Sequence, residues 1–207
     1  MFLYENFISY KKYGNNRNYS RNINCRCNKS LCAPQSNQDK VELRYKVKPS
    51  GSFEEHILKN APKPNLIFKG EEKIAKFVVD VTNNILYHYN QLGEAVGVYS
   101  VATGKPSTPT HTGYRMVTHV ETYPYKTAPK ISKRRKNPKS YGPKIICLEK
   151  IDLQTGEKGI TGEFIHGNNN PASLGKKASH GCIRMDNEII KYLSSLVKRG
   201  DFVIIKK

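Results

Sequence analysis

Residues 178–185 read ASHGCIRM and lead into the clearest helical pattern of the chain. In residues 187–197, apolar side chains recur three and four positions apart, and Asp186 stands where an N-cap residue is expected. Gly200 predicts the end of this helix, and residues 201–205 are apolar and β-branched enough to predict a final strand. Cys182 is therefore expected between a loop and the N-terminus of a late helix.

The chain before this stretch reads as short strands separated by turns. Alternating apolar residues or β-rich runs predict strands at residues 74–81, 85–89, 95–101, 114–120 and 144–149. Asn83-Asn84 supplies the turn between the first two, as in a hairpin. The sequence therefore predicts a mostly β domain with one late helix.

The apolar residues are concentrated in the later two thirds of the 207-residue chain. Residues 1–50 contain eight Asn and clustered Lys and Arg with almost no apolar periodicity, so we expect a disordered basic tail. Residues 51–73 include the proline-broken run Ala61-Pro62-Lys63-Pro64 and are expected to form a linker or edge segment. Residues 74–207 are assigned to the compact domain.

Composition limits the classes of protein that the chain can belong to. No apolar run approaches the roughly 18 residues that a spanning helix needs, so no membrane span is expected. Residues 1–8 are interrupted by Glu5 and Asn6 before the apolar core of a signal peptide can build up, so no export signal is visible. Five cysteines are too few and too unevenly placed for a disulfide framework, and their odd number leaves at least one thiol free: Cys25, Cys27, Cys32, Cys147 and Cys182.

Cys182 has the surroundings of a reactive thiol. Cysteine attacks as the thiolate, which nearby helix amides, a histidine and an arginine all favour. His166 lies sixteen residues upstream, at the end of a β-like run, and a loop before the helix can bring the two side chains together as nucleophile and base. Gly181 lets the backbone approach a substrate oxygen, so amides around Gly181 and Cys182 could form an oxyanion hole.

Three linked segments resemble one known family. Residues 165–171 (IHGNNNP) and 179–185 (SHGCIRM) closely resemble the active-site signature of the L,D-transpeptidases of the YkuD type, in which a His-Gly precedes a Ser-His-Gly-Cys. Residues 100–114 (SVATGKPSTPTHTGY) look like the family's upstream Ser-Thr-Gly-Lys and Thr-Pro-x-Thr-Gly segment. The resemblance covers roughly residues 74–206 and implies the sandwich-like or barrel-like β fold of that catalytic domain.

The resemblance implies a cysteine acyltransferase that forms peptidoglycan cross-links in the bacterial cell envelope. Cys182 would attack the carbonyl before the terminal D-Ala of a tetrapeptide stem, and the acyl group would pass to an amine. His166 would be the base. In the family a Ser side chain or a backbone carbonyl after the His orients it, and with Gly167 at that position only the carbonyl is available here. His180 would help shape the oxyanion pocket, and Arg184 would bind a substrate carboxylate. Ser179 and Gly181 would orient the loop, and no cofactor or metal is implied.

Other interpretations of these residues remain open. Transfer of the acyl group to water would make the protein an L,D-carboxypeptidase. Arg184 could instead pair with Glu188 one turn on. Zinc is possible by ligand type at His166, His180 and Cys182. Cys147 is expected in the core, and His111 and His119 in ordinary surface or core positions. Cys25, Cys27 and Cys32 could bind a metal by ligand type, but without a second ligand cluster none is expected.

Charge supports a rival hypothesis. The chain carries 35 Lys and Arg against 17 Asp and Glu, a formal net charge of +18. Between Glu121 and Glu149 there are eight basic residues and no acidic one, interleaved with Tyr123, Tyr125 and Tyr141. Such a block could bind nucleic acid without catalysis, although an anionic wall polymer or plain solvation is the favoured interpretation. A nucleic-acid binder would have no use for a Cys182 and His166 pair.

Overall fold

The computed structural model of the protein describes residues 58–207. The expected basic tail of residues 1–50 lies outside the described residues. Within 58–207, no helix combines the length and the apolar character that crossing a bilayer requires.

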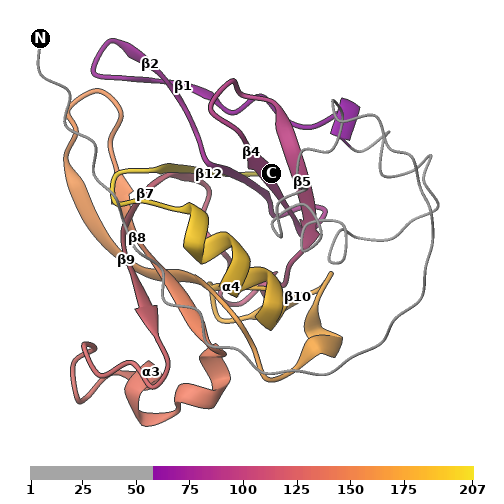
Figure 1. Cartoon of the computed structure of the whole chain (residues 1–207), viewed down its shortest axis with the longest axis vertical. Coiled ribbons are helices and arrows are strands. Elements are labelled where there is room, and N and C mark those ends of the chain that lie inside the picture. The colour runs from indigo at the N-terminus through magenta and orange to yellow at the C-terminus, as the bar shows by residue number, and fades with distance from the viewer. Residues whose placement is uncertain (1–57) are drawn as a thin grey trace, which may run out of the picture. The chain divides into compact units, whose positions relative to one another are not determined.

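One eight-stranded sheet organises the described chain (Figure 1). Its strands lie in the order β11 (Ile183–Arg184), β9 (Lys158–His166), β8 (Lys144–Ile151), β7 (Gly113–Thr122), β12 (Phe202–Lys206), β3 (Phe77–Asp80), β4 (Ile85–Tyr89) and β5 (Ala95–Ser100). Two small sheets accompany it: the hairpin of β1 (Asn65–Phe68) with β2 (Glu71–Ile74), and the parallel pair of β6 (Thr103–Gly104) with β10 (Lys177–Ser179). The helices are α3 (Lys133–Lys136), α4 (Asn187–Leu196) and the 3-10 turns η1 (Pro138–Tyr141) and η2 (Pro171–Ser173). The predicted architecture, mostly β with one long late helix, is confirmed.

The two edges of the large sheet meet. Ala102 follows β5, and its N–H and C=O bond to the C=O and N–H of Arg184 on β11, each at 2.8 Å. This bridge joins the last strand of the sheet to the first, so the sheet curls back on itself in a barrel-like manner. The closure lies two residues after Cys182 in the chain.

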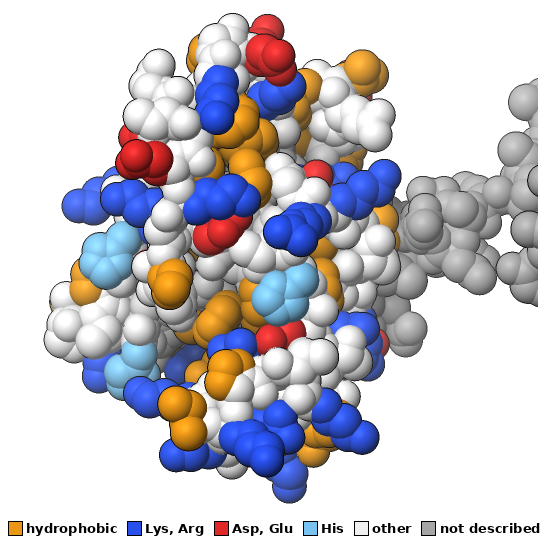
Figure 2. All heavy atoms as spheres, turned by 90° about the vertical axis from the view of Figure 1, so that its left-hand side faces the viewer, with side chains coloured by type: hydrophobic (Ala, Val, Ile, Leu, Met, Phe, Trp, Pro, Cys, Tyr) orange, Lys and Arg blue, Asp and Glu red, His pale blue; other side chains and the backbone are white. Residues whose placement is uncertain are grey.

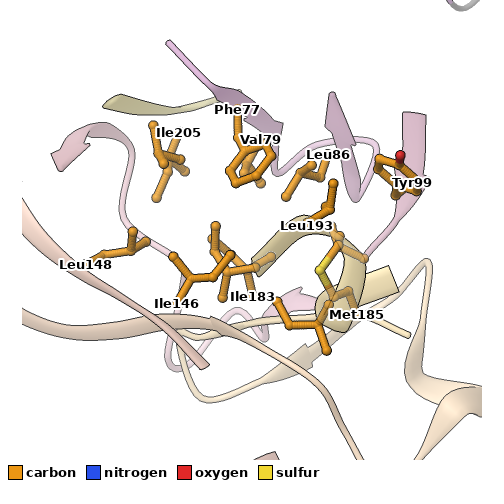
Figure 3. Close-up of a cluster of buried hydrophobic side chains, with 14 of the residues drawn as sticks. Phe77, Val79, Leu86, Tyr99, Ile146, Leu148, Ile183, Met185, Leu193 and Ile205 are labelled. Carbon is orange, nitrogen blue, oxygen red and sulfur yellow. The ribbon is translucent and has the colours of Figure 1, made fainter. Parts of the chain in front are cut away.

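Helix α4 fills the interior of the curled sheet. Its apolar face buries Ile189, Ile190 and Leu193. Figure 3 shows Leu193 among side chains of β3, β4 and β5 on one side and of β8 and β11 on the other, including Phe77, Leu86 and Ile146. Side chains on one face of a helix recur about every 3.6 residues, and those on one face of a strand recur every second residue. The apolar spacings in the sequence therefore match the side chains that form this core.

One boundary predicted from the sequence was wrong. The strand expected over 74–81 is interrupted, because Ile74 ends the hairpin with β1 and the chain then turns so that Phe77 can pair with Val203 of β12. The helix expected over about 187–197 spans Asn187–Leu196, and Val197 is already extended. Gly200 takes a left-handed φ of 96° in the turn into β12, and its amide bonds to Val117 O at 2.9 Å.

The loop before β7 fastens the loop that carries Cys182. Thr110, which is 6% exposed, accepts a hydrogen bond from Gly104 N at 2.8 Å and donates one to Gly181 O at 2.8 Å. Lys105 N adds a bond to Ser179 O at 3.0 Å. One buried hydroxyl therefore ties the segment before β7 to the residue that precedes Cys182.

Thr110→Val should lower the free energy of unfolding by about 1–3 kcal/mol, because a buried donor on Gly104 and a buried acceptor on Gly181 lose their partner while the side-chain volume hardly changes. Thr110→Ser keeps the hydroxyl and should stay much closer to the parent. Urea unfolding of the three proteins measures the difference. Equal stability of the Val and Ser variants would show that the hydroxyl does not hold this loop.

Candidate active site

Cys182 lies in the loop between β10 and β11, not at the N-terminus of α4. The helix begins five residues later, and the Asp186 carboxylate already accepts the first-turn amides of Glu188 at 2.7 Å and Ile189 at 3.2 Å. The expectation that helix amides stabilise a Cys182 thiolate is therefore wrong, because strand β11 separates the thiol from the helix and the helix's own cap takes those donors.

His166 ends β9 and is buried, with 3% of its surface exposed. Its Nδ1 donates a hydrogen bond to the Gly167 carbonyl at 2.5 Å. In a neutral imidazole this contact places the proton on Nδ1, so Nε2 carries the lone pair. Burial, outweighing the Gly167 and Tyr141 carbonyls, lowers the pKa of His166 to about 4, and the nearby Arg184 charge acts in the same direction.

Cys182 and His166 line the same cavity, which has a volume of about 170 Å³. Register explains how they meet: β11 runs parallel to β9, and Arg184 stands opposite His166. Cys182, just before β11, is thus carried to the end of β9. The other lining residues are Lys133, Ser140, Tyr141, His180 and Arg184.

The Cys182 thiol is half-buried, and its Sγ lies 3.9 Å from the Gly162 carbonyl. Burial is the main cause that raises the pKa of the thiol, and the Glu163 carboxylate adds to it. The Phe164 backbone amide and Arg184 oppose the shift without reversing it. Burial thus disfavours the charged form of both cavity-lining groups, the Cys182 thiolate and the His166 imidazolium.

The expectation that the Gly181 amide contributes to an oxyanion hole is wrong. The Gly181 N–H is not available, because it donates to Ser179 Oγ at 3.1 Å. Ser179, fully buried, also donates to the Cys182 carbonyl at 2.5 Å, so its hydroxyl holds the turn in shape. Gly181 has a φ of 112°, which a side chain would strain. Within residues 58–207, the Cys182 amide has no hydrogen-bond acceptor.

Gly167, the glycine of the His-Gly motif, lies in a space that leaves no room for a side chain. A Cβ at Gly167 would lie 2.3 Å from Asn187 Oδ1 and 2.9 Å from Pro143 Cδ. Asn187 Oδ1 also accepts the Asn168 amide at 2.9 Å. The backbone after His166 is therefore packed against the start of α4, and only its carbonyl reaches the imidazole.

The remaining predicted residues lie at the rim of the cavity. His180 is exposed and Arg184 half-exposed. Arg184 does not pair with Glu188, whose carboxylate bonds to Lys191 Nζ at 2.5 Å instead. The structure thus brings Cys182, His166, His180 and Arg184 to one cavity.

Residues 123–143, which we call the cover segment, contribute lining residues that sequence reasoning missed. The Tyr141 ring packs against the His166 ring, tilted by 42° with the centroids 4.7 Å apart, and Tyr125 OH donates to the Gly142 carbonyl. Arg134 pins α3 through two bonds to the buried Glu121, at 2.6 and 3.0 Å. A hairpin of residues 144–149 with residues 163–165 would have indicated that Tyr141 lies near His166. In the structure β8 and β9 pair in this way and place Ile145, four residues after Tyr141, opposite His166.

Two further polar clusters account for the histidines without a motif. Glu163, a buried residue of β9, binds Arg115 at 2.8 Å and His111 Nδ1 at 3.1 Å. His119, Glu121 and Cys147 place possible metal-ligand atoms within 4.8 Å of one another. Both oxygens of Glu121 are bonded to Arg134, however, and burial raises the pKa of Cys147 to about 12. The prediction that Cys147 belongs to the core is confirmed.

Comparisons with known proteins agree with the sequence motifs. The model of the YkuD family, described as the L,D-transpeptidase catalytic domain, matches residues 75–205. YkuD of Bacillus subtilis, named for this activity, is 54% identical over 43 residues, which are 21% of this chain and 26% of that protein. YqjB of the same organism, named likewise, is 37% identical over 111 residues, 53% of this chain and 58% of that protein. The matches thus span less than two thirds of either relative.

The fold of this chain is also similar to that of solved structures. An L,D-transpeptidase of Enterococcus faecium aligns with a TM-score of 0.46 and 23% identity, over 64% of this chain and 49% of that one. One from Mycobacterium tuberculosis aligns with a TM-score of 0.44 and 20% identity, over 63% and 57%. The family model alone covers more than half of the chain, from β3 through β12. The chain therefore belongs to the L,D-transpeptidase catalytic domain family.

Proposed function

We propose that the protein is a cysteine acyltransferase that acts on peptidoglycan stem peptides, with Cys182 as nucleophile and His166 as base. The observation that carries the proposal is the shared cavity: the two side chains line it together, and the Gly167 carbonyl leaves His166 Nε2 as the ring's acceptor. Family membership supplies the substrate class.

The reaction balances with these two groups alone. His166 takes the thiol proton while Cys182 Sγ attacks the carbonyl of the third stem residue. The carbon–nitrogen bond to the terminal D-Ala then breaks, and His166 returns the proton to the leaving amine. An amine of a neighbouring stem attacks the thioester, loses its proton through His166 and frees the thiol. Attack by water in the same step would give L,D-carboxypeptidase activity.

The resting protonation states favour general-base catalysis over a preformed ion pair. A thiolate–imidazolium pair needs a thiol pKa below that of the imidazole, whereas here the Cys182 pKa is raised and the His166 pKa is lowered to about 4. Both shifts arise from burial, which disfavours each charged form. Proton transfer therefore accompanies attack, and the free Cys182 N–H is the donor that we assign to the developing oxyanion.

The cavity suits a substrate that carries carboxylates. Lys133 and Arg184 line it, His180 stands at its rim, and none of its lining residues is acidic. We assign Arg184 to a carboxylate of the donor stem, as the motif suggests. Placement in the bacterial cell envelope, a part in cell shape and acylation of Cys182 by carbapenems follow as proposals from the same activity.

Cys182→Ala should abolish release of D-Ala from a tetrapeptide stem, because no other described thiol lines the cavity. Mass spectrometry of muropeptides after incubation with the protein measures both the tripeptide product and any cross-linked dimer. Cys147→Ala is the matched control, since it removes the other described thiol, and it should keep the activity. Turnover by Cys182→Ala at the parent rate would refute the proposed nucleophile.

His166→Ala should slow acylation of Cys182 by roughly two to four orders of magnitude, the usual contribution of a positioned base. In the parent, a base with a pKa of about 4 stays neutral down to that pH. The rate should therefore hold as the pH falls through 6.5 and decline only near pH 4, measured with a carbapenem on protein whose circular dichroism is unchanged.

His180→Ala is the control for this prediction, because that imidazole is exposed and its loss should slow acylation much less. If His180→Ala lost the activity and His166→Ala kept it, the base would have been misassigned. An acid limb centred near pH 6.5 would instead show that the base titrates as an ordinary imidazole, which contradicts the effect of burial on His166.

A further inference from the structure

The cover segment presents a surface of unpaired lysines. No acidic residue occurs between Glu121 and Glu149, and Glu121 is itself buried and neutralised by Arg134. Five lysines of the segment are exposed and make no side-chain hydrogen bond or ion pair with any residue of 58–207: Lys126, Lys130, Lys133, Lys136 and Lys139. In Figure 2, Lys and Arg side chains gather at the lower end of the molecule, the level at which α3 lies in Figure 1.

The two arginines of the segment hold it in place instead of adding to this surface. Arg134 binds Glu121 and lies over the Phe164 ring at 5.0 Å. Arg135 donates to the carbonyls of Lys126 at 2.7 Å and Ala128 at 3.0 Å. Because these bonds and the Tyr125 anchor fix the backbone, the lysines are arranged before any partner arrives, which lowers the entropy cost of binding.

The tyrosines interleaved with the lysines are not a stacking platform. Tyr125 is fully buried, and Tyr141 packs on His166, so only Tyr123, 47% exposed, could stack on a base. Binding of single-stranded nucleic acid draws on aromatic stacking as well as charge. Lysine, a flexible point charge, suits repeated phosphates whose spacing varies, whereas planar bidentate recognition uses arginine. The surface therefore favours a flexible polyanion without bases.

We propose that these lysines bind an anionic phosphodiester polymer of the cell wall and so hold the catalytic cavity against its peptidoglycan substrate. Lys133 connects the two, because it belongs to α3 and also lines the cavity that holds Cys182. The choice of a wall polymer as partner rests on the proposed function. The charge and geometry that bind it are properties of the cover segment alone.

The test uses the full chain and poly(glycerol phosphate) as the probe. Replacing Lys126, Lys130, Lys136 and Lys139 by Gln leaves Lys133 in the cavity and should weaken binding at least about tenfold in 50 mM salt, because each lost charge removes counterion release. A variant with the same net charge replaces four exposed lysines elsewhere and should bind within about twofold of the parent: Lys63, Lys198, Lys206 and Lys207.

Two outcomes would overturn the inference. In one, both variants lose affinity equally, which would show that only net charge matters. In the other, a single-stranded DNA oligonucleotide with the same number of phosphates binds the parent at least tenfold more tightly than the polymer, which would favour nucleic acid.

Turnover of a soluble tetrapeptide stem separates this inference from the proposed function. The four-lysine variant of the cover segment should turn over the soluble stem at the parent rate, because none of its changed residues lines the cavity. Loss of that turnover would mean that these lysines serve catalysis and not docking. A parent without turnover would refute the proposed function but leave the binding comparison valid.

Discussion

The pair of backbone hydrogen bonds between Ala102 and Arg184 is the constraint on which the site depends. Without it the sheet would end in two free edges, β5 and β11, and unpaired edges are costly when they border a core. With it, the short strand β11 is held on both sides, by β9 and by the residue after β5. Cys182 lies directly before this strand, so closure of the sheet also positions the thiol.

Burial sets the chemistry of the pair that closure brings together. Tyr141 packs against the buried His166, and the loss of hydration makes the imidazolium costly. The same loss of hydration disfavours the Cys182 thiolate. Polar groups in a covered site of this kind interact through a low local dielectric.

Close packing leaves no room for a side chain at Gly167, and this affects how His166 is oriented. Asn187 and Pro143 occupy the space that a side chain would need, and the Gly167 carbonyl accepts the hydrogen bond from His166 Nδ1. The cover segment meets Gly167 at Gly142, where a Cβ would lie 2.7 Å from Gly167 Cα. The orientation of the His166 ring and the position of the cover segment thus depend on the same close contact.

Sequence alone determined the mostly β class, helix α4 with its Asp186 cap, and the set Cys182, His166, His180 and Arg184, because periodicity, capping and linked motifs are local signals. Only the tertiary structure decided that the helix amides do not reach Cys182, that Gly181 N–H is occupied by Ser179, and that Tyr141 and Lys133 belong to the cavity. These outcomes depend on strand register and on contacts between residues far apart in the chain. A local pattern carries no information about which distant backbone fills a space or takes a hydrogen bond.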